Sequence, residues 1–277
     1  MDKQLPNLVL SRVQDILRQD SEQALPVVQS VSLFFQQQLS HWTRKITDGK
    51  TPFVIALTGP SGSGKSFLRK ILVEQLGQLS DVSAFTQDNY YRDFELDFPH
   101  LPLERFYDEI DFDDPAHIRF RDLANDLGRL GNLPLGSRLG IPQLRYGTPV
   151  RKPAIIEEGL EIQVTHFVVT EGIHAFHHPA VLPHYDLKIY VDVDEHTRRE
   201  RWLARNRREN RGTTDNMWNT TVTCLENHIL PTRQVADLII NNNAPREQVA
   251  DFTTELIHTL ARLRKQETPV TTQREIA

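Results

Sequence analysis

The stretch Gly59-Pro60-Ser61-Gly62-Ser63-Gly64-Lys65-Ser66 decides the fold, because it matches the pattern G-x-x-x-x-G-K-[ST]. The apolar run Phe53–Thr58 before it predicts a buried parallel strand, and Phe67–Leu76 after it has the apolar spacing of a helix. A phosphate-binding loop requires this order: its glycines let successive N–H groups face phosphate oxygens, and the helix N-terminus adds positive potential. An ordinary glycine-rich turn would leave Lys65-Ser66 unexplained, so the sequence predicts a nucleoside triphosphate site.

The motif also assigns roles to individual residues. Lys65 is expected to reach the β- and γ-phosphates, and the Ser66 hydroxyl to hold Mg²⁺. The predicted nucleotide-binding residues are Gly59, Pro60, Ser61, Gly62, Ser63, Gly64, Lys65, Ser66 and Phe67.

Composition limits the class of protein. A chain of 277 residues can form one large α/β domain with a small appendage. The net charge of −5 gives no electrostatic argument for nucleic acid or anionic membrane as a partner. The single cysteine, Cys224, excludes an intramolecular disulfide and suits a reducing compartment. No run approaches the ~18 apolar residues of a membrane span, so we expect a soluble, cytoplasmic protein.

Strand and helix patterns alternate from residue 52 onward, which is typical of a doubly wound parallel sheet with helices on both faces. Further strands are predicted at 82–86, 166–170, 187–192 and 238–241, and helices at 115–130, 195–209, 215–230 and 246–264. Residues 155–164 have the pattern of a β-hairpin insertion that turns at Glu158-Gly159, and 131–153 that of a long loop. The expected fold is therefore an α/β P-loop NTPase.

The first 50 residues differ from the rest. Apolar residues at helical spacing over 8–17 and 27–39 predict two amphipathic helices. The predicted division is a helical extension over 1–50 and a P-loop domain over 51–277. The extension could pack on the core, form a homo-oligomer or bind a partner, and packing is the simplest of these.

Acidic residues follow two of the predicted strands. Asp88, after the second strand, would stand across the phosphate loop and could accept a proton from an attacking hydroxyl; the alternative is a helix cap. Glu171, after strand 166–170, would hold Mg²⁺ beside Ser66.

Seven arginines lie between residues 198 and 211, and they include Arg205 and Arg211. They predict a mobile lid whose guanidinium groups neutralise the transferring phosphoryl group. A solvated helix face or a nucleic-acid patch are the alternatives. Four nearby histidines have no usual zinc spacing: His174, His177, His178 and His184.

Five ordered segments resemble the uridine kinase/phosphoribulokinase family, and uridine–cytidine kinases in particular, over residues 52–245. They are Gly59–Ser66, Gln87–Tyr91 (Q-D-[SD]-[FY]-Y), Asp111–Pro115 (N-F-D-x-P), Glu171–Phe176 (E-G-I-x-A-F) and Leu230–Ile240 (L-P-T-x-x-x-A-D-x-I-I). The resemblance implies ATP as donor. It also implies roles for single residues: Asp88 as general base, Glu171 for Mg²⁺, Arg205 and Arg211 at the phosphates, and Tyr91 and Asp113 in the acceptor pocket.

The acceptor segment departs from that family. Where uridine kinases have Y-D-[FY]-x-x-H-x-R, this chain has Leu144–Arg151, in which Tyr146 and Arg151 remain as substrate-binding candidates and Pro149 replaces the histidine. Trp202 also replaces a substrate-side arginine. The expected function is an ATP- and Mg²⁺-dependent kinase of a small-molecule hydroxyl. A nucleoside is the first guess, and a sugar phosphate or another alcohol is the alternative. A nucleotide-dependent regulator without catalysis is the rival from another class.

Overall fold

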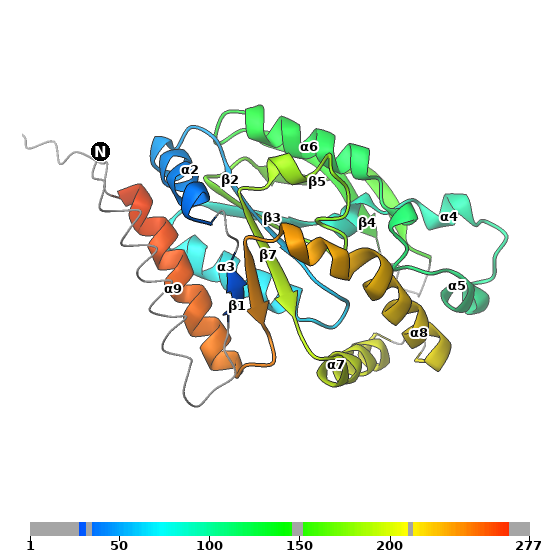
Figure 1. Cartoon of the computed structure of the whole chain (residues 1–277). Coiled ribbons are helices and arrows are strands. Elements are labelled where there is room, and N and C mark those ends of the chain that lie inside the picture. Colours follow the sequence, from blue (N-terminus) through cyan, green and yellow to red (C-terminus); the bar gives the residue numbers. More distant parts are fainter. Residues whose placement is uncertain (1–27, 32–34, 146–151, 210–212, 266–277) are drawn as a thin grey trace, which may run out of the picture.

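The computed structural model describes residues 28–31, 35–145, 152–209 and 213–265. Its centre is a six-stranded sheet in the order β1-β8-β7-β2-β6-β3 (Figure 1). The strands are β1 Val28–Val31, β2 Phe53–Thr58, β3 Val82–Thr86, β6 Phe167–Glu171, β7 Leu187–Asp192 and β8 Leu238–Asn241. Neighbouring strands from β8 to β3 are parallel, and β1 pairs with β8 in the antiparallel direction. The predicted doubly wound sheet is confirmed.

Helices cover both faces of the sheet. Successive side chains of each buried strand point to opposite faces, so both faces carry apolar side chains that must be covered. Ile55 and Leu57 of β2 join one core cluster, and Val54 and Ala56 join the other. The first cluster is completed by α2 Phe35–Asp48, α3 Lys65–Leu79 and α9 Arg246–Lys265. The second is completed by α6 Phe120–Asn132, α8 Asp215–Cys224 and the short helices α4 Phe94–Asp97 and α5 Leu103–Glu109. Figure 1 shows α6 on the side of the sheet away from α3 and α9.

The two helices that follow β7 in the chain, α7 (Glu195–Arg208) and α8, have N-termini capped by side chains. α7 begins where the Asp194 side chain accepts a hydrogen bond from the Thr197 N–H at 2.8 Å. α8 begins where the Thr214 hydroxyl accepts one from the Met217 N–H at 3.3 Å. Both were predicted, but the helix expected over 215–230 ends as an α-helix at Cys224 and continues as a π-helical turn, Leu225–Ile229. The helix predicted over 115–130 instead consists of a 3₁₀ turn, Pro115–His117, followed by α6.

The N-terminal prediction is partly wrong. Residues 28–31 form β1 rather than a helix, since this valine-containing segment satisfies its backbone groups against β8. The described helix in this region is α2, and it packs on the sheet through Trp42 and Ile46. The helix predicted over 8–17 lies outside the described residues. The division of the chain at residue 50 stays a prediction.

The hairpin prediction is also wrong in its details. β5, Ala154–Gln163, continues through Glu158-Gly159 without a turn and pairs with β4, Arg138–Arg145, in a separate two-stranded sheet. Ile141 pairs with Leu160 and Gln143 with Ile156, so β5 bulges where a turn was expected. Glu158 has φ +50° at this bulge. The expected long loop over 131–153 therefore contains a strand.

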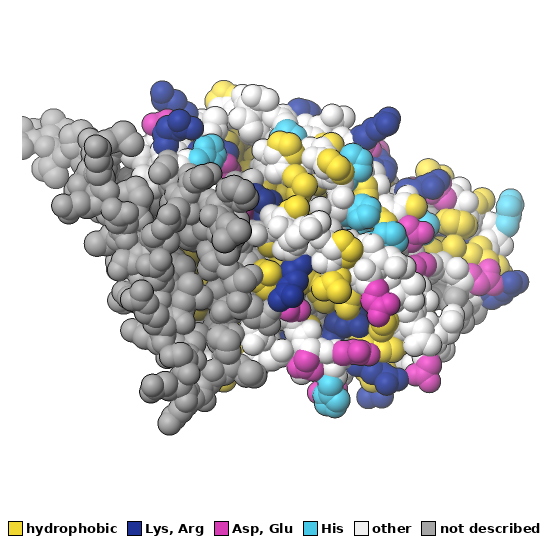
Figure 2. Space-filling view, viewed as in Figure 1, with side chains coloured by type: hydrophobic (Ala, Val, Ile, Leu, Met, Phe, Trp, Pro, Cys, Tyr) yellow, Lys and Arg dark blue, Asp and Glu magenta, His cyan; other side chains and the backbone are white. Residues whose placement is uncertain are grey.

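The described surface mixes charges. On the face shown in Figure 2, basic and acidic side chains are interspersed over the part that is not grey. Within the described residues, no helix combines the length and the apolar character needed to cross a membrane.

Candidate active site

The phosphate loop joins β2 to α3, and its glycines are required by close contacts. Gly59 has φ +144°, and a Cβ there would lie 2.3 Å from the carbonyl oxygen of Val191 on β7. Gly64 has φ +93° and would place a Cβ 2.1 Å from the Asn242 amide nitrogen. That amide also donates to the Ser63 carbonyl at 2.6 Å. The loop is thus held against two neighbouring strands in a conformation that side chains would prevent.

Lys65 is buried inside this loop. Its Nζ donates to the carbonyl oxygens of Gly59 at 2.8 Å and Pro60 at 3.0 Å. Burial lowers the pKa of Lys65 to about 8, although the nearby carboxylates of Glu171 and Asp88 favour the charged form. The ammonium group is therefore held among the loop carbonyls and available for an anion.

Ser66 and Glu171 meet as the sequence predicted. The Ser66 hydroxyl donates to Glu171 Oε1 at 3.0 Å, because β6 is the neighbour of β2 and ends at the level of the loop. Arg69 Nε lies 3.7 Å from the same oxygen. A hydroxyl and a carboxylate are hard oxygen donors, which suit Mg²⁺ when nucleotide phosphates complete its coordination. These residues fit the predicted metal.

Several buried donors around the loop have no hydrogen-bond partner among the described residues. They are Ser63 Oγ and one nitrogen each of Arg198, Arg201 and Arg205. Arg205 also donates to Ser61 Oγ at 2.9 Å, and Arg201 to the Asn242 carbonyl at 3.0 Å. Buried polar groups are nearly always satisfied in native proteins. Unsatisfied cationic donors at a helix N-terminus therefore indicate that an anion completes the site.

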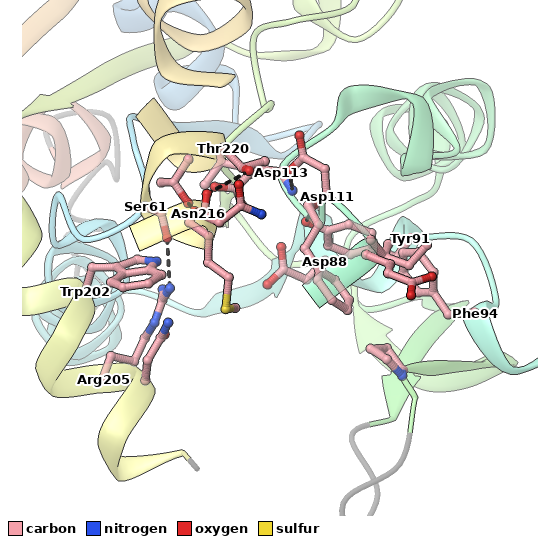
Figure 3. Close-up of a pocket in the computed structure, with 18 residues that line it drawn as sticks. Ser61, Asp88, Tyr91, Phe94, Asp111, Asp113, Trp202, Arg205, Asn216 and Thr220 are labelled. Atoms are coloured by element: carbon pink, nitrogen blue, oxygen red, sulfur yellow. Dashed lines mark hydrogen bonds between the residues drawn. The ribbon is translucent and has the colours of Figure 1, made fainter. Parts of the chain in front are cut away.

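A cavity of about 280 Å³ opens beside the loop. Ser61 and Arg205 lie at one end of it, while Asp88, Asp113 and Tyr91 lie across from them (Figure 3). The remaining lining residues are Phe94, Glu109, Ile110, Asp111, Phe112, Pro153, Ile173, Trp202, Asn206, Asn216, Met217, Thr220 and Thr221. The phosphate loop and the predicted base thus border a single space large enough for a small molecule.

The acidic segment beside the cavity is held by buried hydrogen bonds. The Asp113 carbonyl lies 2.5 Å from His174 Nε2 and accepts from Cys224 Sγ at 2.8 Å. The His174 N–H donates to Gln87 Oε1 at 3.0 Å, which links the ends of β3 and β6 to this segment. Burial lowers the pKa of His174 to about 4, so its ring is neutral and donates from Nε2 at pH 7. His174 therefore orients the acidic segment.

Burial also changes the protonation of the acidic residues. It raises the pKa of Asp111 to about 6, and the neighbouring carboxylates of Asp113 and Asp114 contribute. Burial likewise raises the pKa of Asp113, against the opposing effect of the Arg205 and Lys65 cations. Both carboxyl groups therefore hold a proton more readily than an exposed carboxyl group does.

Most residues predicted for the site come together. Lys65, Ser66, Asp88, Glu171 and Arg205 lie around the loop and the adjoining cavity. Tyr91 and Asp113 line the cavity, and the Tyr91 hydroxyl donates to the Phe112 carbonyl at 2.9 Å. Phe67 follows Ser66 in α3, and its ring packs under the Arg246 guanidinium at the N-terminus of α9, at 5.3 Å. Tyr146, Arg151 and Arg211 lie outside the described residues. The individual catalytic roles stay predictions.

Sequence reasoning missed the wall that α7 and α8 provide. The sequence identified Trp202 only as the residue that replaces a substrate-side arginine of the family. It gave no role to four further lining residues: Asn216, Met217, Thr220 and Thr221. The i, i+4 spacing of Met217 and Thr221 places both residues on one face of a predicted helix. This spacing does not predict which other element that face contacts.

The sheet and the loop define a P-loop nucleotide-binding protein, and a small-molecule cavity adjoins the loop. The model of the phosphoribulokinase/uridine kinase family matches residues 54–250. The uridine kinase of Clostridium perfringens is 30% identical over 207 residues, which cover 73% of this chain and 93% of that protein. The chain therefore belongs to the phosphoribulokinase/uridine kinase family. It is a P-loop kinase, and the family implies the use of ATP, usually with Mg²⁺.

Two solved structures share the fold. Phosphoribulokinase from Rhodobacter spheroides aligns with a TM-score of 0.50 at 16% identity and covers 70% of each chain. D-glycerate 3-kinase from Cryptococcus neoformans aligns with a TM-score of 0.50 at 13% identity, over 88% of this chain and 96% of that one. At these identities the likeness concerns the fold alone.

Proposed function

We propose that the protein transfers the γ-phosphate of ATP to a hydroxyl of a small metabolite without negative charge, with a nucleoside as the first candidate. One observation carries this proposal: the cavity places Asp88 and Asp113 opposite Ser61 and Arg205 of the phosphate side. A hydroxyl bound between them would face the phosphoryl group and have a carboxylate within reach.

Different residues have separate roles in the proposed transfer. Lys65 and Arg205 bind phosphate oxygens and neutralise charge that develops during transfer. Asp88 accepts the proton of the attacking hydroxyl, and Asp113 orients the acceptor. Ser66 and Glu171 would hold Mg²⁺, which supplies charge neutralisation at the phosphates when bound. Closing α7 over the site would exclude water.

The charge of the cavity supports an acceptor that is not anionic. Four acidic side chains line it, those of Asp88, Glu109, Asp111 and Asp113, although burial raises the pKa of Asp111 and of Asp113 and so reduces their share of the negative charge. Among the described lining residues, Arg205 is the only cation, and it already donates to Ser61. Two like charges about 4 Å apart repel by roughly 4 kcal/mol near a protein surface. An acceptor phosphate would meet this repulsion, whereas an uncharged alcohol would not.

An acceptor panel tests the proposal. ATP-dependent phosphorylation should occur with uncharged alcohols such as uridine, cytidine, ribose or glycerol, and the kcat/KM for ribulose 5-phosphate should be far lower than for the preferred alcohol. Comparable kcat/KM for ribulose 5-phosphate would contradict the charge argument. Tight ATP binding with no transfer to any hydroxyl would favour the non-catalytic regulator instead.

A further inference from the structure

His174 lies behind the cavity wall, in a backbone segment that is anchored to the sheet. The residue is fully buried and follows the end of β6, and its neighbour Ile173 lines the cavity. The Thr58 hydroxyl at the end of β2 is shared between the carbonyl oxygens of Gly172, at 3.1 Å, and Ile173, at 3.0 Å. The segment that carries His174 is therefore held at a defined level of the sheet.

The backbone of His174 holds the segment that carries Asp88. Its N–H donates to Gln87 Oε1 at 3.0 Å, and the Gln87 side chain is itself buried. A Cβ on Gly172 would lie 2.2 Å from the same oxygen, so the Gln87 side chain packs directly on the backbone of this glycine. Since Asp88 follows Gln87 in the chain, these contacts fix the backbone that carries the proposed base.

The side chain of His174 holds the segment that carries Asp113. Its Nε2 lies 2.5 Å from the Asp113 carbonyl oxygen, and a carbonyl oxygen can only accept, so Nε2 carries the ring proton. Among the described residues, the other ring nitrogen, Nδ1, has no hydrogen-bond partner, which agrees with a neutral ring. Cys224 Sγ at the end of α8 donates to the same carbonyl at 2.8 Å. Two buried donors from different parts of the fold therefore hold Asp113.

We propose that His174 is a positioning residue that sets the position of the Asp113 carboxyl group relative to that of Asp88. The inference rests on the proposed kinase function, in which Asp88 takes the proton of the attacking hydroxyl and Asp113 orients the acceptor. Both side chains line the cavity on the side opposite Arg205 (Figure 3). Because His174 is bonded to both segments, it keeps the two carboxyl groups directed at the same acceptor molecule.

Loss of the ring donor should therefore produce a particular defect. Reacting groups must be held within about 0.5 Å of their productive positions, and a misplacement of about 1 Å can reduce the rate about 10²-fold. Without Nε2, the Asp113 carbonyl keeps the weaker thiol donor of Cys224, and its segment can shift relative to Asp88. The phosphate loop has its own contacts, so ATP should still bind. Water could then replace a misaligned hydroxyl, and ATP would be hydrolysed without transfer.

The first test compares His174→Leu, His174→Gln and His184→Leu with the wild type at saturating ATP and acceptor. His174→Leu should reduce kcat by about tenfold or more and raise the ratio of ADP released to acceptor phosphorylated, while the Kd for ATP stays close to wild type. The glutamine amide can donate from a similar position, so His174→Gln should recover most of the transfer. His184, in the turn Leu182–His184, provides the same substitution as a control.

The ratio of ADP to product separates positioning from stability. A protein that is merely less stable loses active molecules, but each remaining molecule keeps the wild-type ratio. A wild-type kcat and ratio in His174→Leu, a defect that His174→Gln does not relieve, or an equal defect in His184→Leu would overturn the proposal.

The second test needs no acceptor. Amide hydrogen exchange on the full chain, read by mass spectrometry, reports how readily each segment opens. His174→Leu should increase exchange in both 87–92 and 111–115 and leave 53–66 unchanged, and His174→Gln should reverse both increases. Absence of transfer to every hydroxyl by the wild type would defeat the kinase proposal alone; exchange that stays unchanged in either segment of His174→Leu would defeat this one.

Discussion

At the scale of single residues, Lys65 shows how burial prepares a group for its ligand. Its ammonium is held by two loop carbonyls, and burial lowers its pKa to about 8. Bound phosphates would favour the charged form and raise the pKa again. Binding is then linked to protonation, since only the charged lysine pairs with the phosphate oxygens.

This linkage predicts a pH dependence for ATP binding. The free protein loses the Lys65 proton as pH rises through about 8, so ATP affinity should fall above that pH, by about tenfold between pH 7 and pH 9. Isothermal titration with a non-hydrolysable analogue measures it. Lys65→Ala should bind weakly with a flat profile over this range. A wild-type affinity that stays constant to pH 9 would contradict the expected role of the lysine.

Residue roles differ in how well the sequence predicts them. Asp88 and Glu171 follow strands, and parallel strands end at one edge of a sheet, so their meeting at the loop could be predicted. His174 was noticed only as one of several histidines. Its hydrogen bond to the Asp113 carbonyl joins segments 61 residues apart, and no local pattern encodes such a pairing.

At the scale of elements, the local sequence pattern predicted the wrong type of structure in two segments that pair with a neighbouring strand. Glu158-Gly159 has the composition of a turn, yet β5 continues through it because β4 is available as a partner and the extra residues form a bulge in β5. Residues 28–31 follow a helical spacing, yet they pair with β8 at the sheet edge. In both cases an available strand partner overrides the local preference.

The attachment of α2 leads to a stability prediction. The buried Asp186 carboxylate pairs with Lys45 Nζ at 2.5 Å and accepts the Val54 N–H at 2.8 Å, while Trp42 Nε1 donates to the Asp186 carbonyl at 2.6 Å. Asp186→Ala should lower the free energy of unfolding by about 3 kcal/mol, because it leaves buried donors unpaired. Urea denaturation measures this change.

An exposed ion pair provides the matched control. Lys70 and Glu74 lie 3.7 Å apart on the solvent side of α3, and Glu74→Ala should change the free energy of unfolding by less than about 0.5 kcal/mol. Equal effects of Glu74→Ala and Asp186→Ala would show that α2 is not anchored through Asp186.

At the scale of the whole molecule, the sheet and the loop follow from sequence, whereas the acceptor wall does not. The alternation of buried strands with helices specifies the two layers around the sheet, and the glycine-rich motif specifies where phosphates bind. The wall depends on how α7 and α8 pack against each other through Trp202 and Trp218. That contact depends on tertiary packing, which a helical pattern in one segment does not encode.

The central claim is that the cavity between the phosphate loop and Asp88 is a phosphoryl-transfer site. The direct test is kcat with the preferred acceptor for Asp88→Asn, compared with wild type and with Asp122→Asn on α6 as a control. Asp88→Asn cannot accept the hydroxyl proton, so kcat should fall by about 10²- to 10⁴-fold, while the Kd for ATP and the activity of the control stay close to wild type. A kcat for Asp88→Asn near that of wild type would contradict the account.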